Sequence, residues 1–184
     1  PFAGSFSSNA VLSGRYLIVG DVSVEAGATL AVLAGSVIEI STAASPALDI
    51  WGAIDARGGA LGRITIGPAS GRTSGSWQGL RLRPGAAASL SGCDVSGAEI
   101  AIEGSQADVD LTDCTFTGNT YGAYLTDCSL DARSSAFSNS DSTGAYLSGG
   151  TSVIDDCLFD ANTLGGLWYH GAGSHSLSAS TMSG

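Results

Sequence analysis

Short alternating runs of apolar and polar residues recur along the second half of the chain. Residues 90–95, 111–116, 132–137, 154–159 and 177–182 follow one template, with an apolar residue first, a small residue at the fourth position and an apolar residue at the sixth. Successive copies start 21 to 23 residues apart. Alternation with a period of two is typical of β-strands, and no segment carries a helical stripe long enough for a helix. The pattern predicts an all-β chain.

A second apolar block follows the template within each copy. These blocks are residues 100–102, 123–125, 145–147 and 167–169, and a glycine precedes the last three. Repeats of about 22 residues, with two or three short strands and glycine-rich bends, describe turns of a parallel β-solenoid. We expect about eight turns in one domain over residues 1–184. Residues 1–15 are expected to form an N-terminal cap or extension, and residues 174–184 an incomplete last turn.

Stacked turns predict continuous rows of inward side chains about 4.8 Å apart. The core rows expected in the second half consist of Cys93, Cys114 and Cys157, and of Val95, Phe116, Phe137 and Phe159. The thiols are interpreted as small core residues. A Cys93–Cys114 disulfide is the alternative, because neighbouring turns bring Cα atoms within bridging range. The sequence leaves the pairing of these cysteines and of Cys128 open, and a linear stack is poor geometry for a metal site.

The same alternation predicts an outward row of aromatic side chains. If Ala123 and Leu125 point inward, Tyr124 points outward, and Tyr146 and Trp168 occupy the equivalent positions one and two turns later. Aromatic rings stack on sugar faces and are frequent anchors of protein interfaces. The three residues are therefore the candidate binding residues, and an ordinary cross-strand stack is the alternative.

The low and mainly negative charge of the chain limits the kinds of molecule that it could bind. Charged residues are 13% of the 184 residues, the formal net charge is −10, and all seven basic residues are arginines. This balance excludes phosphate-backbone binding as a main activity, because such binding needs a basic surface. No apolar run approaches the roughly 20 residues that span a bilayer. We therefore expect neither a nucleic-acid partner nor a membrane span.

Two segments resemble a known family. The resemblance is to right-handed parallel β-helix proteins of the pectate-lyase-like superfamily. It lies in residues 20–32 (Gly-Asp-Val-x-Val-x-Ala-Gly-Ala-Thr-Leu-x-Val) and residues 75–80 (Gly-Ser-Trp-Gln-Gly-Leu). The Cys-x-Phe copies resemble repeats of bacterial surface β-helix proteins. The resemblance implies a right-handed coil. For an active lyase it further implies calcium-binding Asp residues and a basic residue that removes a proton.

Acidic residues give the least implausible catalytic site. Asp110 and Asp131 fall at equivalent outward positions on neighbouring turns, as do Asp113 and Asp156 two turns apart, and Asp94 lies close by. Arg133 beside Asp131 is the only acid–base neighbourhood that the repeats supply. A calcium site at these carboxylates is a further alternative. We interpret the Asp residues mainly as charges that keep the sheet faces soluble, and we expect no cofactor.

These features favour a non-catalytic structural or adhesive β-helix on the bacterial cell surface or outside the cell. The chain is expected to be a segment of a larger surface protein or a subunit of a filament. Its expected partners are a second copy, stacked head to tail or laterally, or a surface glycan or protein. The alternatives are a polysaccharide lyase or glycoside hydrolase, and a glycan-binding module.

Overall fold

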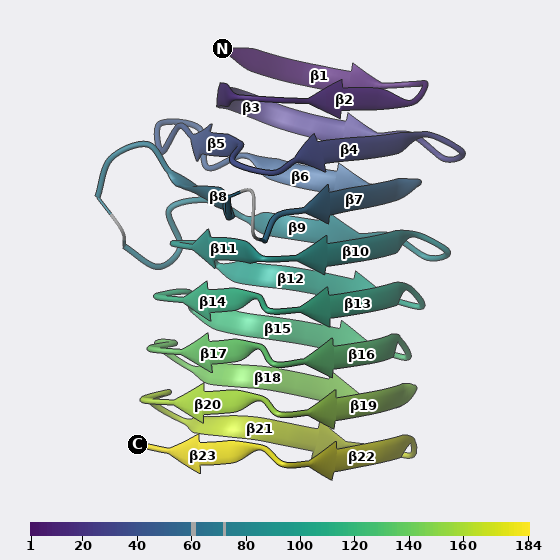
Figure 1. Cartoon of the computed structure of the whole chain (residues 1–184), viewed down its shortest axis with the longest axis vertical. Coiled ribbons are helices and arrows are strands. Elements are labelled where there is room, and N and C mark those ends of the chain that lie inside the picture. Colours follow the sequence, from purple (N-terminus) through teal and green to yellow (C-terminus); the bar gives the residue numbers. More distant parts are fainter. Residues whose placement is uncertain (60–61, 72) are drawn as a thin grey trace.

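The computed structural model describes residues 1–59, 62–71 and 73–184 as a rod of stacked β-strands (Figure 1). The chain runs through three faces in each turn, and every strand pairs in parallel with its equivalents in the neighbouring turns. The described residues contain no helix. The all-β parallel solenoid of about eight turns is therefore confirmed.

Each face contains eight strand positions among the described residues. Face 1 consists of β1 (Phe2–Phe6), the end of β3 (Arg15–Val24), β6 (Ala47–Ile50), β9 (Gly79–Leu82), β12 (Ile100–Ser105), β15 (Tyr121–Thr126), β18 (Thr143–Ser148) and β21 (Gly165–His170). Face 2 consists of β2 (Ala10–Leu12), β4 (Thr29–Leu33), β7 (Ala53–Arg57), β10 (Ala87–Ser91), β13 (Asp108–Thr112), β16 (Ser129–Arg133), β19 (Thr151–Asp155) and β22 (Ser174–Ser178). Face 3 consists of the start of β3, β5 (Val37–Ile40), β8 (Ile64–Pro68), β11 (Cys93–Ser96), β14 (Thr115–Thr117), β17 (Ala136–Ser138), β20 (Leu158–Asp160) and β23 (Thr181–Ser183). In Figure 1, face 1 is the fainter set of strands behind the other two.

The core consists of inward rows that run along the rod. Val95, Phe116, Phe137 and Phe159 are paired in register and almost fully buried. The ring centroids of Phe116 and Phe137 lie 4.9 Å apart, and those of Phe137 and Phe159 lie 5.2 Å apart. Because the side chains of a strand alternate between its two faces, each turn repeats the same apolar positions and extends these rows.

Left-handed backbone at the corners lets each turn change direction. Between faces 2 and 3, φ is positive in successive turns at Gly92, Asp113, Ser134 and Asp156. Residues with positive φ also recur at the other two corners: Asp127 is one of those between faces 1 and 2, and Asn139 is one of those between faces 3 and 1. Glycine adopts this conformation without steric cost, and Asp and Asn tolerate it better than most residues. Most of these corner positions therefore carry glycine or a polar residue, and Ala161 and Ala179 are exceptions.

Buried polar side chains connect neighbouring turns through backbone groups. The Oδ1 atom of Asn119 accepts a hydrogen bond from Ala98 N at 2.9 Å, and Asn162 Oδ1 accepts one from Ser140 N at 3.0 Å. In the cysteine row, Ser135 Oγ accepts a hydrogen bond from the amide of Cys114 at 3.1 Å. The polar residues that interrupt apolar rows therefore satisfy backbone groups that would otherwise be buried without partners.

The two ends of the rod differ in how their inward rows are covered. At the start, residues 1–15 contain β1, β2 and the first residue of β3, and the stacked rings of Phe2 and Phe6 pack against the core. Residues 174–184 contain β22 and β23, which extend faces 2 and 3. In the last turn, Tyr169, Leu177 and Met182 continue buried rows but are 41% to 50% exposed.

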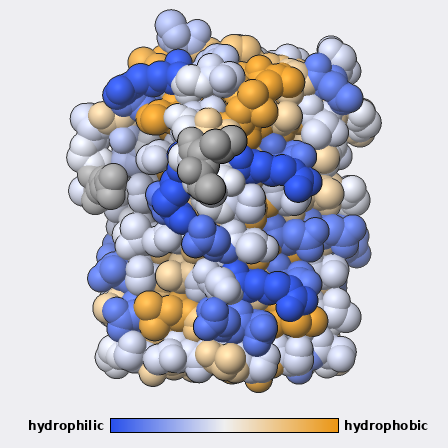
Figure 2. All heavy atoms as spheres, in the orientation of Figure 1, coloured by the Kyte–Doolittle hydropathy of each residue, from blue (hydrophilic) through white to orange (hydrophobic). Residues whose placement is uncertain are grey.

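The described residues on the side of the rod formed by faces 2 and 3 show no continuous apolar stripe. Figure 2 shows apolar residues in separate patches between polar and charged ones. The described residues 69–71 and 73–76 of the long connection from β8 to β9 extend to one side of the rod (Figure 1). The connection returns to face 1 through Trp77, which is fully buried and donates a hydrogen bond from Nε1 to Ser96 O at 2.9 Å.

Candidate functional site

The outer surface of face 1 brings the predicted aromatic residues into one row. Tyr124 of β15 pairs with Tyr146 of β18, which pairs with Trp168 of β21. Ala123 and Leu125 are buried on either side of Tyr124, so the tyrosine points outward. Both tyrosines are half-buried and Trp168 is 52% exposed.

The rings do not form an open ladder of three. Tyr124 and Tyr146 stack with their centroids 4.7 Å apart and their planes 14° apart, and the edge of Tyr121 meets Tyr124 at 5.8 Å. The next ring beside Tyr146 is His170, at 6.3 Å, rather than Trp168. Tyr124 and Tyr146 each cover one face of the other's ring, and Tyr124 also borders a space beside β12.

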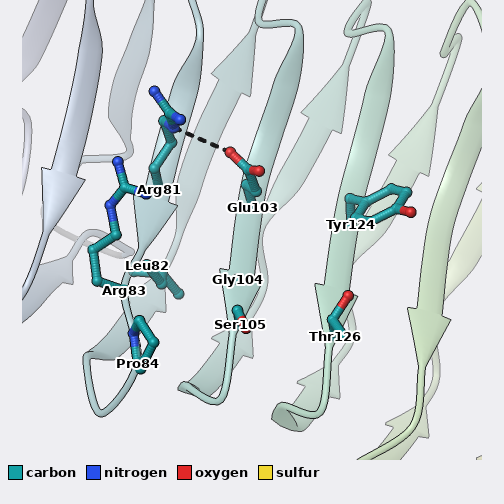
Figure 3. Close-up of a pocket in the computed structure, with 9 residues that line it drawn as sticks. All are labelled: Arg81, Leu82, Arg83, Pro84, Glu103, Gly104, Ser105, Tyr124 and Thr126. Atoms are coloured by element: carbon teal, nitrogen blue, oxygen red, sulfur yellow. Dashed lines mark hydrogen bonds and ion pairs between the residues drawn. The ribbon is translucent and has the colours of Figure 1, made fainter.

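A notch lies between this ring and the arginines of β9 (Figure 3). Its volume is about 230 Å³. Arg83 and Pro84 form one wall, Tyr124 and Thr126 form the other, and Ser105 of β12 lies between them. The neighbouring Gly104 faces the core, where an added Cβ would lie 2.9 Å from Leu125 and 3.1 Å from the sulfur of Cys128. Ser105 pairs with Thr126 of β15, and these two small side chains leave the notch open beside Arg83, whereas Glu103 is the residue that pairs with Tyr124.

Two arginines and two carboxylates form a paired network along the notch. Arg81 Nε donates to Glu103 Oε2 at 3.1 Å and lies 3.9 Å from Asp49 Oδ1. Arg83 pairs with the same Asp49 and places its guanidinium carbon 5.5 Å from the centre of the Trp51 ring. The formal charges of these four groups sum to zero.

The sequence interpretation missed this network and was wrong about where arginines occur. It named Arg133 beside Asp131 as the only acid–base neighbourhood of the repeats, whereas Arg81 and Arg83 pair with acidic residues on face 1 and Arg63 pairs with Asp94 and Asp113. The alternation Leu80-x-Leu82 was the available signal, because it places Arg81 outward between two buried leucines.

The four catalytic candidates do not form one constellation. Asp110 and Asp131 face each other on β13 and β16, and both line a second groove of about 380 Å³ on face 2. Arg133 Nε lies 2.9 Å from Asp131 Oδ1. Asp113 instead lies at the corner before face 3, where its carboxylate accepts a hydrogen bond from Arg63 at 3.0 Å. The pair Asp110–Asp131 therefore has one arginine beside it, and Asp113 belongs to another network.

The cysteines lie in the core as free thiols. Cys93, Cys114 and Cys157 occupy the inward row, and Cys128 fills the space beside Gly104. Burial raises the pKa of Cys128 and of Cys157, and a hydrogen bond to Cys114 together with burial raises that of Cys93. These three groups are therefore held as protonated thiols, the less reactive form.

Neither a metal centre nor a membrane span is found in the part of the chain that the structure covers. No group of three or more His, Cys, Asp or Glu side chains converges there in a way that could hold a metal ion. No helix of the described residues is long and apolar enough to cross a bilayer.

Comparison with known proteins places the chain in a family. A family described as "Right handed beta helix region" matches residues 72–184, more than half of the chain. The protein belongs to this right-handed β-helix family. Searches of curated proteins and of solved structures give no match.

Proposed function

We propose that this protein is a non-catalytic adhesive β-helix of the bacterial cell exterior that binds a glycan in the notch on face 1. The notch has the two components that sugar binding needs, the aromatic ring of Tyr124 in its lining and polar groups on the opposite side. Its volume of about 230 Å³ is below the roughly 300–1,000 Å³ of pockets that enclose drug-sized ligands. It therefore suits one sugar ring of a longer chain.

The ring of Tyr124 in the lining of the notch, next to Glu103 of β12, carries this proposal. The test is retention of the purified chain on immobilised polysaccharides, compared with Tyr124→Ala and with Leu158→Ala as a control that removes an exposed apolar side chain from face 3. Tyr124→Ala is expected to abolish retention and Leu158→Ala to preserve it. Equal retention of both variants and the parent chain, or no retention on any polysaccharide, would rule the proposal out.

A further inference from the structure

The charges around the notch bear on which kind of sugar it accepts. Each arginine already faces a carboxylate, since Arg81 pairs with Glu103 and Arg83 pairs with Asp49. Among the described residues that line the notch, neither arginine is therefore without a carboxylate partner, and the whole chain carries a net charge of −10. A carboxylate on the sugar would lie close to that of Glu103, which lines the notch.

The hydrogen-bonding groups of the notch complement hydroxyl groups. Arg83 donates to Asp49 through Nη2, and its Nη1 has no acceptor among the described residues. Glu103 binds Arg81 through Oε2, and within the described part of the chain its Oε1 has no hydrogen bond. A ligand hydroxyl can therefore bind either group without displacing a protein partner. A hydroxyl can accept from Arg83 and donate to Glu103, whereas a carboxylate can only accept.

We infer that the notch is selective for an uncharged sugar ring, which stacks on Tyr124 and presents hydroxyl groups to Arg83 and Glu103. This inference rests on the proposed glycan binding and specifies its substrate class. The ring fits over Ser105, because that residue is the small one between the walls. Repulsion between an acidic sugar and the carboxylate of Glu103 is expected to weaken its binding about ten-fold or more relative to a neutral sugar of equal size.

The test compares neutral hexasaccharides of glucose, galactose, mannose and xylose with oligogalacturonate of equal length, using calorimetry on the full 184-residue chain at low and moderate salt. At least one neutral probe is expected to bind at least about ten-fold more tightly than the acidic probe. Its affinity should change little with salt, because no charge pairing is involved. Ser105→Phe, which fills the notch and leaves the walls in place, should abolish binding.

Glu103→Gln supplies a sharper test. It leaves Arg81 without this partner while preserving the shape of the notch, so it should strengthen binding of oligogalacturonate and weaken binding of the neutral probe. Circular dichroism checks that each variant is folded. If the parent chain prefers oligogalacturonate and Ser105→Phe abolishes that binding, the selectivity inference fails while glycan binding stands. If no probe binds, or Ser105→Phe changes nothing, glycan binding at the notch fails as well.

Discussion

Removing one ring from the phenylalanine row tests whether stacked core rows hold the rod together. Phe137 is 1% exposed and stacks on Phe116 on one side and Phe159 on the other, with ring planes 14° and 7° apart. Truncating a buried Phe to Ala costs about 3–5 kcal/mol, and aromatic pairs contribute about 0.5–1.5 kcal/mol beyond their burial. Because Phe137→Ala breaks two such pairs, we expect a loss in the upper part of this range, about 4–5 kcal/mol.

Urea unfolding followed by circular dichroism measures this loss. Repeat arrays do not always unfold in one step, so amide hydrogen exchange in β14, β17 and β20 is measured alongside. Leu158→Ala is the matched control, since this residue lies on the adjacent strand but is 39% exposed, and it should cost less than about 1 kcal/mol. Phe137→Leu keeps most of the volume and should fall between the two. A cost below about 2 kcal/mol for Phe137→Ala, or one equal to that of Leu158→Ala, would refute the reasoning.

Three further changes probe other parts of the rod. Arg63→Gln removes the hydrogen bonds from Arg63 to Asp94, at 2.9 Å, and to the carboxylate of Asp113 in the next turn. We expect it to lower the free energy of unfolding in urea by about 1–2 kcal/mol, and an unchanged value would contradict a bridging role for Arg63. Asp110→Asn relieves repulsion from Asp131 directly opposite, and we expect a gain of about 0.2–1 kcal/mol that disappears in high salt. A loss of stability would show that the pair is not repulsive. Burial raises the pKa of Cys157, so thiol reagents at neutral pH should modify it only after unfolding; rapid labelling of the folded chain would show that the core opens.

The fold could be predicted from the sequence because each turn obeys the same local rule. An inward position must be apolar in every copy, so the row from Val95 to Phe159 is visible as a period of about 22 residues. The outward position of Tyr124 follows from its buried neighbours for the same reason. The orientation of its ring does not follow, because the stack on Tyr146 depends on rotamers that alternation leaves free.

The notch and the arginine networks could not be predicted in the same way. Glu103 lies opposite Arg81 only through the register of β9 with β12, and β9 follows an irregular connection that breaks the repeat. Arg63 reaches Asp113 across 50 residues of chain. Such contacts depend on how turns of unequal length align, and a pattern read within one turn contains no information about that alignment.

Some of the acidic residues of the chain occupy corners where the backbone is left-handed. Asp113, Asp127 and Asp156 occupy positions where φ is about 52° to 53°, and equivalent turns place glycine at the same corners. Asn tolerates this backbone as well as Asp does, so the charge at these corners is separable from the bend. Net charge, and with it solubility and the choice of charged partners, can therefore vary at the corners while the coil keeps its path.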